Sequence, residues 1–344
     1  MSVGFREQLV ASLTRQLPSM NIFALRQVLV GLARMRFSVG SLGSELSTLL
    51  LDRLLSSLEA FLPEQVGDVL LSASSLGYCK AYLSRADSAR LIDSLRRVFL
   101  RLPVRDAALV LKGLSAMGYK WHDDLRAVVR INGRIIDAPL SDTIVKYLRQ
   151  RVASMREYEY SVVLQSLGRL GVHWHSSLPQ YVTQKIDHRL TRVGKFFSPS
   201  SLVDTISGLS SMQLLWTQLS PSGRQSLEEA LVDRGFQAMS SDELISSMRS
   251  LDAMKLHMDG TVAQALLSAM RSPSSEENNM RSPSSEENNM RSPSSEENNM
   301  RSPSLEENNM RSPSSEENNM RSPSSKENDV TSQQLISDLE SNMR

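Results

Sequence analysis

Seven basic residues recur at set places around a repeated ten-residue motif, and their chemistry is the neutralisation of a polyanion. They are Arg34, Arg36, Lys112, Lys120, Arg169, Arg249 and Lys255. They fall off the apolar stripe of the helix that the motif predicts, so we expect them in solvent. A row of cations along a groove would neutralise successive phosphates of a nucleic acid. The ordinary alternative is a solvated surface that binds nothing.

The other residues capable of chemistry form weaker patterns. His173 and His175 flank Trp174, but no acid or cysteine stands at a spacing that would complete a metal site. Cys79 is the single cysteine and has no histidine or acid placed to activate it. The chain contains no GxSxG, GxGxxG or HExxH motif and no P-loop. We therefore expect no enzyme activity, no cofactor, no metal and no small-molecule substrate.

Three tryptophans, Trp121, Trp174 and Trp216, each follow the start of a motif by eleven residues. Exposed aromatic rings can stack on the bases of single strands. The corresponding residues of the other copies are Val39, Lys80 and Met258. Because most of these are apolar, we expect the tryptophans to pack in the core at a turn between helices.

The motif that places these residues is Val110–Tyr119, VLKGLSAMGY, and it occurs six times. The other copies start at Val28, Val69, Val163, Thr205 and Ser247, so successive starts are 41, 41, 53, 42 and 42 residues apart. A period of about 20–50 residues is typical of stacked repeats. The second, fifth and eighth residues are apolar and share one helical stripe. All of them are large except Ala73, the fifth residue of the second copy. The fourth is always glycine or serine, which predicts close approach of a neighbouring helix.

Each copy predicts a helix, a turn and a second helix. Glycines at 77, 118 and 171 stand where the first helix ends, and glycine favours a left-handed cap there. Ser240 and Glu243 form a capping-box pattern before the last copy. Residues 5–17 resemble the second helices and are interpreted as a partial repeat; a short targeting helix is the alternative. The excess length of the third copy is placed in a loop insertion at 131–139.

These patterns predict an all-α protein: a right-handed α-solenoid of about six helix-turn-helix repeats over residues 1–270. Residues 271–329 are tandem copies of a decapeptide of the type MRSPSSEENN, predicted to be disordered because they offer almost nothing to bury. Residues 330–344 are a possible short helix. Residues 1–270 have a net charge of +7 and residues 271–344 one of −6. No apolar run reaches the roughly 18 residues that span a bilayer.

The copies VLVGLARMRF, VLKGLSAMGY, VLQSLGRLGV and TISGLSSMQL resemble the first helices of organellar helical-repeat proteins. That group includes octotricopeptide and heptatricopeptide repeat proteins, FAST kinase-like and RAP-domain proteins, and RNA-editing substrate-binding complex proteins. The resemblance covers about residues 5–270. It implies a mitochondrial protein, with plastid or cytoplasm as alternatives, that binds single-stranded RNA and acts in RNA processing, stability or ribosomal RNA assembly. Protein partners would be those of a ribonucleoprotein complex. HEAT and armadillo scaffolds, which bind proteins, share such leucine-rich pairs and are the alternative.

Overall fold

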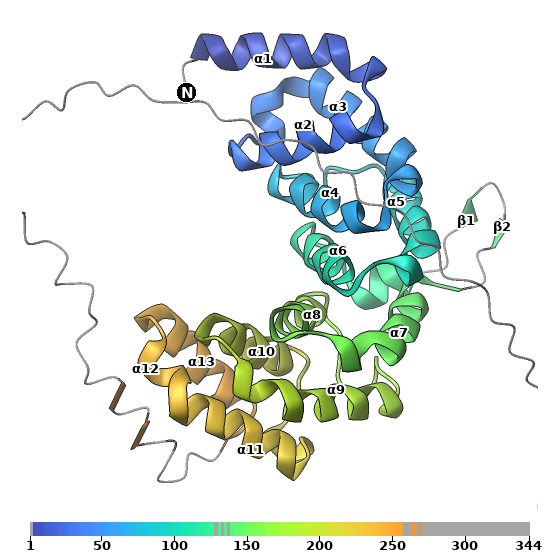
Figure 1. Ribbon diagram of the computed structural model, residues 1–344. Coiled ribbons are helices and arrows are strands. Elements are labelled where there is room, and N and C mark those ends of the chain that lie inside the picture. The colour runs from blue at the N-terminus through green and yellow to red at the C-terminus, as the bar shows by residue number, and fades with distance from the viewer. Residues whose placement is uncertain are drawn as a thin grey trace, which may run out of the picture. The chain divides into compact units, whose positions relative to one another are not determined.

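The computed structural model describes residues 3–126, 130–131, 134–135 and 138–256, together with 262, 264–265 and 268–269. Internal contacts divide the chain into two units, Met1–Arg281 and Ser282–Arg344. All described residues belong to the first unit, so the predictions made for 271–329 and 330–344 lie outside the description. The described part is built of helices (Figure 1), which confirms the all-α prediction.

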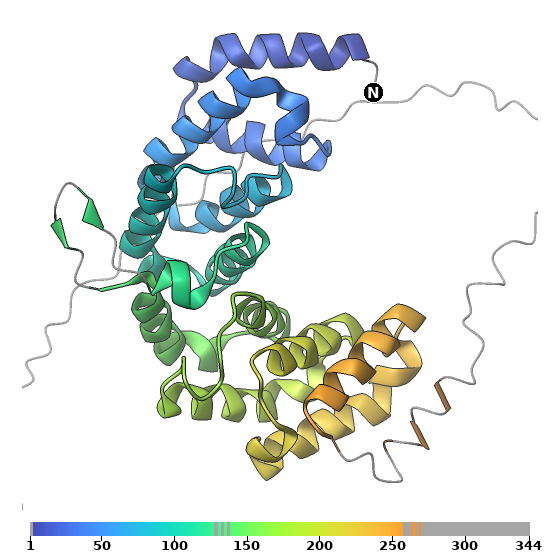
Figure 2. The same cartoon turned by 180° about the vertical axis from the view of Figure 1, so that it is seen from behind.

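The helices form two rows that lie side by side in both views (Figures 1 and 2). The first helices, which contain the motif, are α2 (Ile22–Arg34), α4 (Pro63–Ser75), α6 (Val104–Ala116), α8 (Glu157–Arg169), α10 (Pro199–Ser211) and α13 (Ser241–Ala253). The second helices are α1 (Val3–Gln16), α3 (Val39–Ser57), α5 (Arg85–Val98), α7 (Leu140–Arg151), α9 (Gln180–Val193) and α11 (Pro221–Ala230). Each helix contacts the next member of its own row. Residues 5–16 of the predicted segment 5–17 lie in α1, which packs on α3.

Short helical turns connect the two rows. The 3₁₀ turns η1 (Leu17–Ser19), η2 (Leu58–Ala60), η3 (Phe99–Arg101), η5 (Val152–Ser154) and η6 (Gly194–Phe196) each follow a second helix. The π turn η4 (Trp121–Leu125) and the 3₁₀ turn η7 (Trp216–Gln218) follow first helices. The π turn η8 (Leu231–Gly235) and α12 (Phe236–Ala238) lie between α11 and α13. The capping box of Ser240 and Glu243 is present at the start of α13, as predicted.

The extra residues of the third copy are placed between η4 and α7, where a loop was predicted. The described residues there pair as short antiparallel strands, β1 (Arg130–Ile131) and β2 (Arg134–Ile135). The loop prediction did not include this strand pair, although an Asn-Gly step is also a strong signal for a tight hairpin.

Every first helix ends in the same way, with the ninth motif residue in the left-handed region. Gly77, Gly118 and Gly171 have φ of 94°, 84° and 78°, which confirms the predicted caps. The other three copies have Arg36, Gln213 and Lys255 at this place, with φ of 57°, 59° and 57°. The N–H of the tenth residue then donates to the carbonyl of the fifth, for example Tyr119 N to Leu114 O at 3.1 Å. This closure satisfies a carbonyl that a helix end otherwise leaves open.

A backbone hydrogen bond joins each helix pair to the next. The twelfth residue of one copy donates its N–H to the carbonyl of the eighth residue of the following copy. The bonds are Val39 to Leu76 (2.7 Å), Lys80 to Met117 (2.8 Å), Trp121 to Leu170 (2.7 Å), Trp174 to Met212 (3.0 Å) and Trp216 to Met254 (2.8 Å). Because the bond uses backbone atoms only, it does not depend on which side chain the twelfth residue has.

The predicted apolar stripe is buried, with two exceptions at the ends of the row. Leu111, Leu114 and Met117 of α6 are each at most 2% exposed, as are their counterparts in the neighbouring copies. Met35, the eighth residue of the first copy, is 38% exposed. Met248, the second residue of the last copy, is only partly buried. Both stripe residues lack cover because no first helix precedes α2 or follows α13 in the described part of the chain.

The prediction of close approach at the fourth motif residue is correct for some copies and wrong for Gly31. A Cβ at Gly208 would lie 2.5 Å from the Leu164 carbonyl carbon, and one at Gly113 3.1 Å from Leu70 Cγ. Each glycine thus faces the second residue of the preceding copy. A Cβ at Gly31 would meet nothing within 4 Å, because no described first helix precedes α2.

Where the fourth motif residue is serine, its hydroxyl makes a hydrogen bond within the same helix. Ser72, Ser166 and Ser250 donate to the carbonyl four residues earlier, at 2.7, 2.6 and 3.0 Å. A small side chain that bonds within its own helix leaves no unpaired polar group at a helix contact.

The tryptophans are core residues, as predicted. Trp121, Trp174 and Trp216 are 2%, 4% and 5% exposed. They are therefore not available for base stacking.

We expect Gly208→Ala to destabilise the protein by about 1–3 kcal/mol, because its methyl group would overlap the α8 backbone. The matched variant Gly31→Ala should stabilise it by about 0.5–1 kcal/mol, since alanine is the better helix former and the site is open. Thermal or urea unfolding measures both effects. Equal effects of the two substitutions would contradict the asymmetry of these contacts.

Gln213→Gly should raise stability by about 1 kcal/mol, because an L side chain with positive φ clashes with the following carbonyl. The reverse exchange, Gly171→Gln, should lower stability by a similar amount, which chemical denaturation would show. A neutral Gln213→Gly variant would mean that the left-handed turn does not strain the chain.

Candidate functional site

The seven predicted cations lie toward the C-terminal ends of the first helices and in the turns that follow. Lys112 and Arg249 are third motif residues, Arg34 and Arg169 are seventh, Arg36 and Lys255 are ninth, and Lys120 is eleventh. Lys112 is half-buried and the other six are exposed. Within the described residues, none of the seven makes an ion pair with a carboxylate. Their positive charges are therefore available to a ligand.

The structure places these cations in groups rather than in one continuous row. Lys112 lies on α6 and Arg169 ends α8, and Lys120, in the turn after α6, donates from its Nζ to the Arg169 carbonyl at 3.3 Å. Arg34 and Arg36 lie at the end of α2, and Arg249 and Lys255 lie on α13 and in the turn after it. The third, seventh and ninth residues of the helix pairs between these groups are uncharged: Leu71, Ser75 and Gly77 with α4, and Ser207, Ser211 and Gln213 with α10.

Two of these cations also have a purely structural reason for their place. Arg34 is the last residue of α2 and Arg169 the last residue of α8. A cation in the last turn of a helix interacts favourably with the helix dipole by about 0.3–1 kcal/mol. Their position at the end of a helix therefore does not by itself indicate a ligand.

The first-helix row also has charged residues that the sequence analysis missed. Asp68 of α4 pairs with Arg26 of α2 at 3.0 Å and with Arg105 of α6 at 3.1 Å. This carboxylate joins three successive first helices. Asp68 is the residue just before its motif, and so is Asp204 in the fifth copy. That recurrence was the available signal, although the sequence does not show which neighbouring helix supplies a partner.

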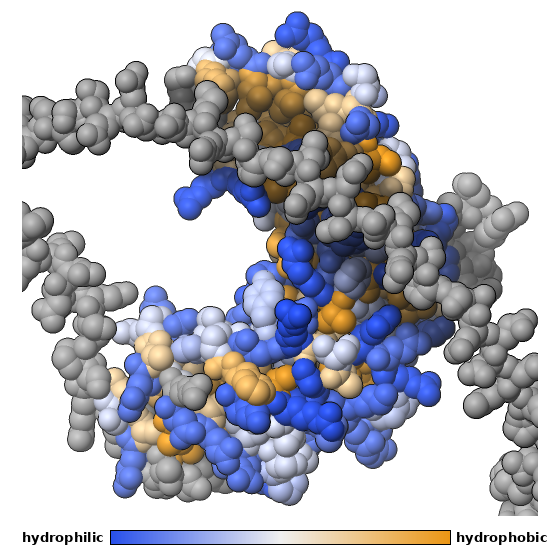
Figure 3. Space-filling view, in the orientation of Figure 1, coloured by the Kyte–Doolittle hydropathy of each residue, from blue (hydrophilic) through white to orange (hydrophobic). Residues whose placement is uncertain are grey.

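Asp204 occupies the same place on α10 but has different neighbours. Its Oδ1 accepts a hydrogen bond from the side-chain amide of Gln165 on α8. Burial raises the pKa of the Asp204 carboxyl, Lys112 and Arg169 act against this increase, and Glu243 adds to it. Two of the predicted cations thus lie close enough to influence this acid. In the view of Figure 3, hydrophilic side chains are prominent over this part of the row, and apolar ones toward α1 and α3.

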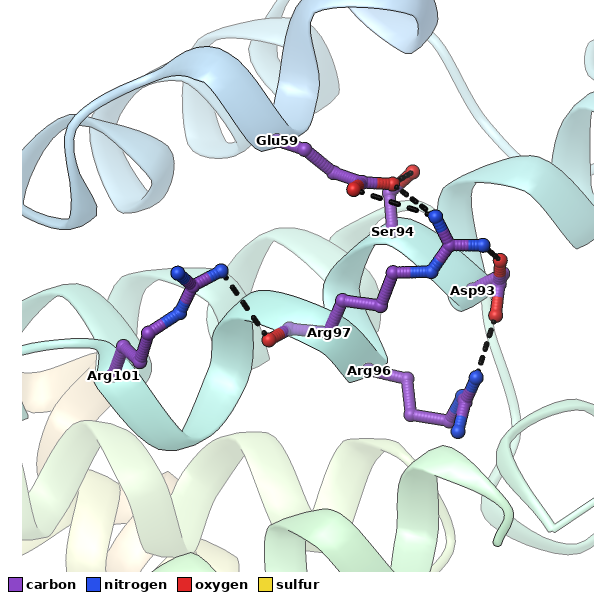
Figure 4. A network of polar contacts seen from close by, with 6 residues as sticks. All are labelled: Glu59, Asp93, Ser94, Arg96, Arg97 and Arg101. Atoms are coloured by element: carbon purple, nitrogen blue, oxygen red, sulfur yellow. Dashed lines mark hydrogen bonds and ion pairs between the residues drawn. The ribbon is translucent and has the colours of Figure 1, made fainter. Parts of the chain in front are cut away.

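Two arginines of the second-helix row, Arg96 and Arg97, take part in a network of polar contacts (Figure 4). Arg97 of α5 binds Glu59 of η2 at 3.0 Å and also pairs with Asp93. Arg96 binds the other oxygen of Asp93 at 3.0 Å, and Ser94 donates to Glu59 at 3.1 Å. These contacts connect neighbouring helix pairs and leave the arginines neutralised within the protein.

His173, one of the two histidines that the sequence analysis weighed as metal ligands, meets a histidine from another copy. The rings of His122 and His173 stack with centroids 5.8 Å apart. Ser177 Oγ accepts a hydrogen bond from the backbone N–H of His173 at 3.0 Å and makes a second one with the ring atom His122 Nε2 at 3.1 Å. Within the described residues, no three histidines, cysteines or acids are grouped as a metal site would require. None of the described helices is long and apolar enough to cross a membrane.

Asp106 is a buried acid at the start of α6, and it too was missed. It is 2% exposed, and its Oδ1 has no hydrogen-bond partner. It packs against Gly67, where an added Cβ would lie 2.9 Å from that oxygen. Burial raises the pKa of the Asp106 carboxyl; Arg105 opposes this, and Asp68 and Glu64 reinforce it. The ionised Asp106 carboxylate therefore destabilises the folded state.

A comparison with known protein families and with curated proteins finds no match for this chain.

Asp106→Asn should stabilise the protein at pH 7, because the folded state disfavours the ionised carboxylate. The raised folded pKa means that the wild type gains stability as the pH falls through that pKa toward about 4, the ordinary value for the unfolded chain. The difference between variant and wild type should therefore shrink over this range. Unfolding curves at pH 7 and pH 4.5 would test it; a gap that widens on acidification would contradict the assignment.

Proposed function

We propose that residues 5–270 form a right-handed α-solenoid of six helix pairs that binds single-stranded RNA along the first-helix row. The proposal extends to a mitochondrial protein without enzyme activity that acts, with protein partners in a ribonucleoprotein complex, in RNA processing, stability or ribosomal RNA assembly. The repeat motif and its resemblance to organellar helical-repeat proteins support this assignment.

The observation that supports RNA binding most directly is the contrast between the two kinds of cation. The seven predicted cations have no carboxylate partner in the described part, whereas Arg26, Arg105, Arg96 and Arg97 do. Cations that bind phosphates displace the counterions condensed on the nucleic acid, which favours association with a polyanion. The neighbouring helices α6 and α8, with the turn after α6, contain three of these cations and are the strongest part of the proposed surface.

A protein-binding scaffold of the HEAT or armadillo type is the second candidate. It is favoured by exposed apolar side chains at the starts of first helices: Phe23 is 61% exposed, Leu62 54% and Tyr158 50%. Together with the acids Asp68 and Asp204, these residues make the row more mixed than a surface dedicated to phosphate would be.

RNA binding by the full chain should weaken steeply with salt, as log K falls by about 0.7 per log unit of salt for each phosphate neutralised on a single strand. Replacing Arg34, Lys112 and Arg169 together by glutamine should lower this slope by about two. Fluorescence anisotropy with a labelled oligoribonucleotide pool over a salt series measures it.

The matched control replaces Arg85, Arg101 and Arg192 by glutamine. These three exposed arginines belong to α5, η3 and α9 of the second-helix row, and none of them makes an ion pair within the described residues. The control removes the same charge and should leave the slope within about half a unit of the wild type. Equal decreases of the salt slope in both triple variants would mean that net charge alone explains the effect. No binding by the wild type at ~50 mM salt would favour the scaffold.

A further inference from the structure

The turns that follow α6 and α8 meet at a pair of histidines. The ring of His122, in η4, stacks on the ring of His173 with the centroids 5.8 Å apart. Next to this pair, Lys120 Nζ donates to the Arg169 carbonyl at 3.3 Å. Trp121 is buried, whereas Lys120 and His122 on either side of it are exposed. Lys120 and His122 therefore lie on the solvent side of one turn.

The repeat itself does not require this histidine pair. His122 is the thirteenth residue of the third copy, and His173 is the eleventh residue of the fourth. The backbone bond between helix pairs is made at the other joints without two histidines at these positions. The residues there are Gly40 and Cys79, Ala81 and Lys120, His175 and Leu215, and Thr217 and His257.

Neither histidine forms an ion pair with an acid in the described part of the chain. His122 Nε2 bonds the neutral hydroxyl of Ser177 at 3.1 Å, and His173 Nδ1 is buried without a hydrogen-bond partner. His122 is thus the exposed ring of the stack, and His173 supports it from the protein side.

The acid of this joint whose contacts are clear, Asp124, is already engaged. It pairs with Lys80 at 2.6 Å and accepts the backbone N–H of Lys120 at 2.7 Å. The other charged or titratable groups of these turns and of the cavity beside them are Asp123, Arg126, Asp142, Arg169 and His175. Charges of both signs thus surround the histidines, and the exposed acid of η4 is Asp123.

We infer that His122 is a further phosphate-binding residue, which takes up a proton when RNA binds at Lys120, and that His173 positions its ring. The inference rests on the proposed function and extends its surface by one residue. Histidine ordinarily changes its charge between about pH 5 and 8. A phosphate beside an imidazole favours the charged form of the ring. Because binding then takes up a proton, the affinity for RNA rises as the pH falls.

The test compares His122→Gln with His188→Gln in the full-length chain. Both substitutions remove one exposed histidine, but His188 belongs to α9 of the second-helix row. Between pH 7.5 and 5.5, at ~50 mM salt, the wild type and His188→Gln should gain roughly three- to tenfold in affinity for an oligouridylate. His122→Gln should gain less than about twofold. Equal gains in the three proteins would overturn the inference, because the proton would then be taken up elsewhere.

A second measurement counts the protons directly. Calorimetry of the same binding at pH 6.5, in two buffers with different ionisation enthalpies, gives the number of protons taken up. The wild type should take up about half a proton more than His122→Gln, since an imidazole is partly charged at this pH. A purely structural role of the stack would leave the proton uptake unchanged.

Inorganic tripolyphosphate separates failure of the inference from failure of the proposed function. If the wild type binds no oligouridylate at either pH, the RNA proposal fails, and NMR of the histidine rings decides the role of His122. The chain has five histidines, and the two variants identify the signals of His122 and His188. The His122 signal should titrate at a higher pH with tripolyphosphate than without it, whereas that of His188 should not move. An unmoved His122 signal would overturn the phosphate site.

Discussion

The stacking of the helix pairs depends on the backbone hydrogen bond from the twelfth residue of one copy to the eighth residue of the next. The acceptor is a carbonyl in the last turn of a first helix, one of those that have no partner inside the helix. The donor can reach it only if both helices end at the same motif residue. The left-handed ninth residue fixes that end, including in the copies where it is Arg36, Gln213 or Lys255. In these copies the left-handed residue destabilises the chain by about 1–2 kcal/mol, and it is kept because the connection between pairs requires this conformation.

Packing between first helices adds a second constraint in the same direction. Leu164 of α8 lies against Gly208 of α10, and Leu70 of α4 against Gly113 of α6. A small fourth residue lets the helices approach, and the approach brings the twelfth N–H to the eighth carbonyl of the next pair. The apolar stripe and the backbone bond are thus satisfied by one geometry, so each added pair repeats the same set of contacts.

The sequence predicted the parts of this structure that are local to one copy. The helix positions, the caps at Gly77, Gly118 and Gly171, and the burial of Trp121 follow from residue types at fixed spacing. Features that depend on a neighbouring copy were predicted less well. Gly31 and Met35 match the motif yet are open, because no described first helix precedes α2. Their own sequence does not show this. The partners of Asp68 and the surroundings of Asp106 belong to three different helices, so spacing alone could not identify them.

The third, seventh and eleventh motif residues take no part in the backbone connection between pairs, and five of the seven predicted cations stand at these positions. The cations are divided into groups by the α4 and α10 pairs, which have no charged residue at these three positions and have the acids Asp68 and Asp204 just before the motif. A ligand that uses all the cations must therefore span helix pairs that offer it no cation. Contacts separated in this way act as linked weak sites, whose combined affinity far exceeds that of any one of them. A long flexible polyanion meets this requirement, since it can engage each group in turn, whereas a compact anion can reach only the group on α6 and α8.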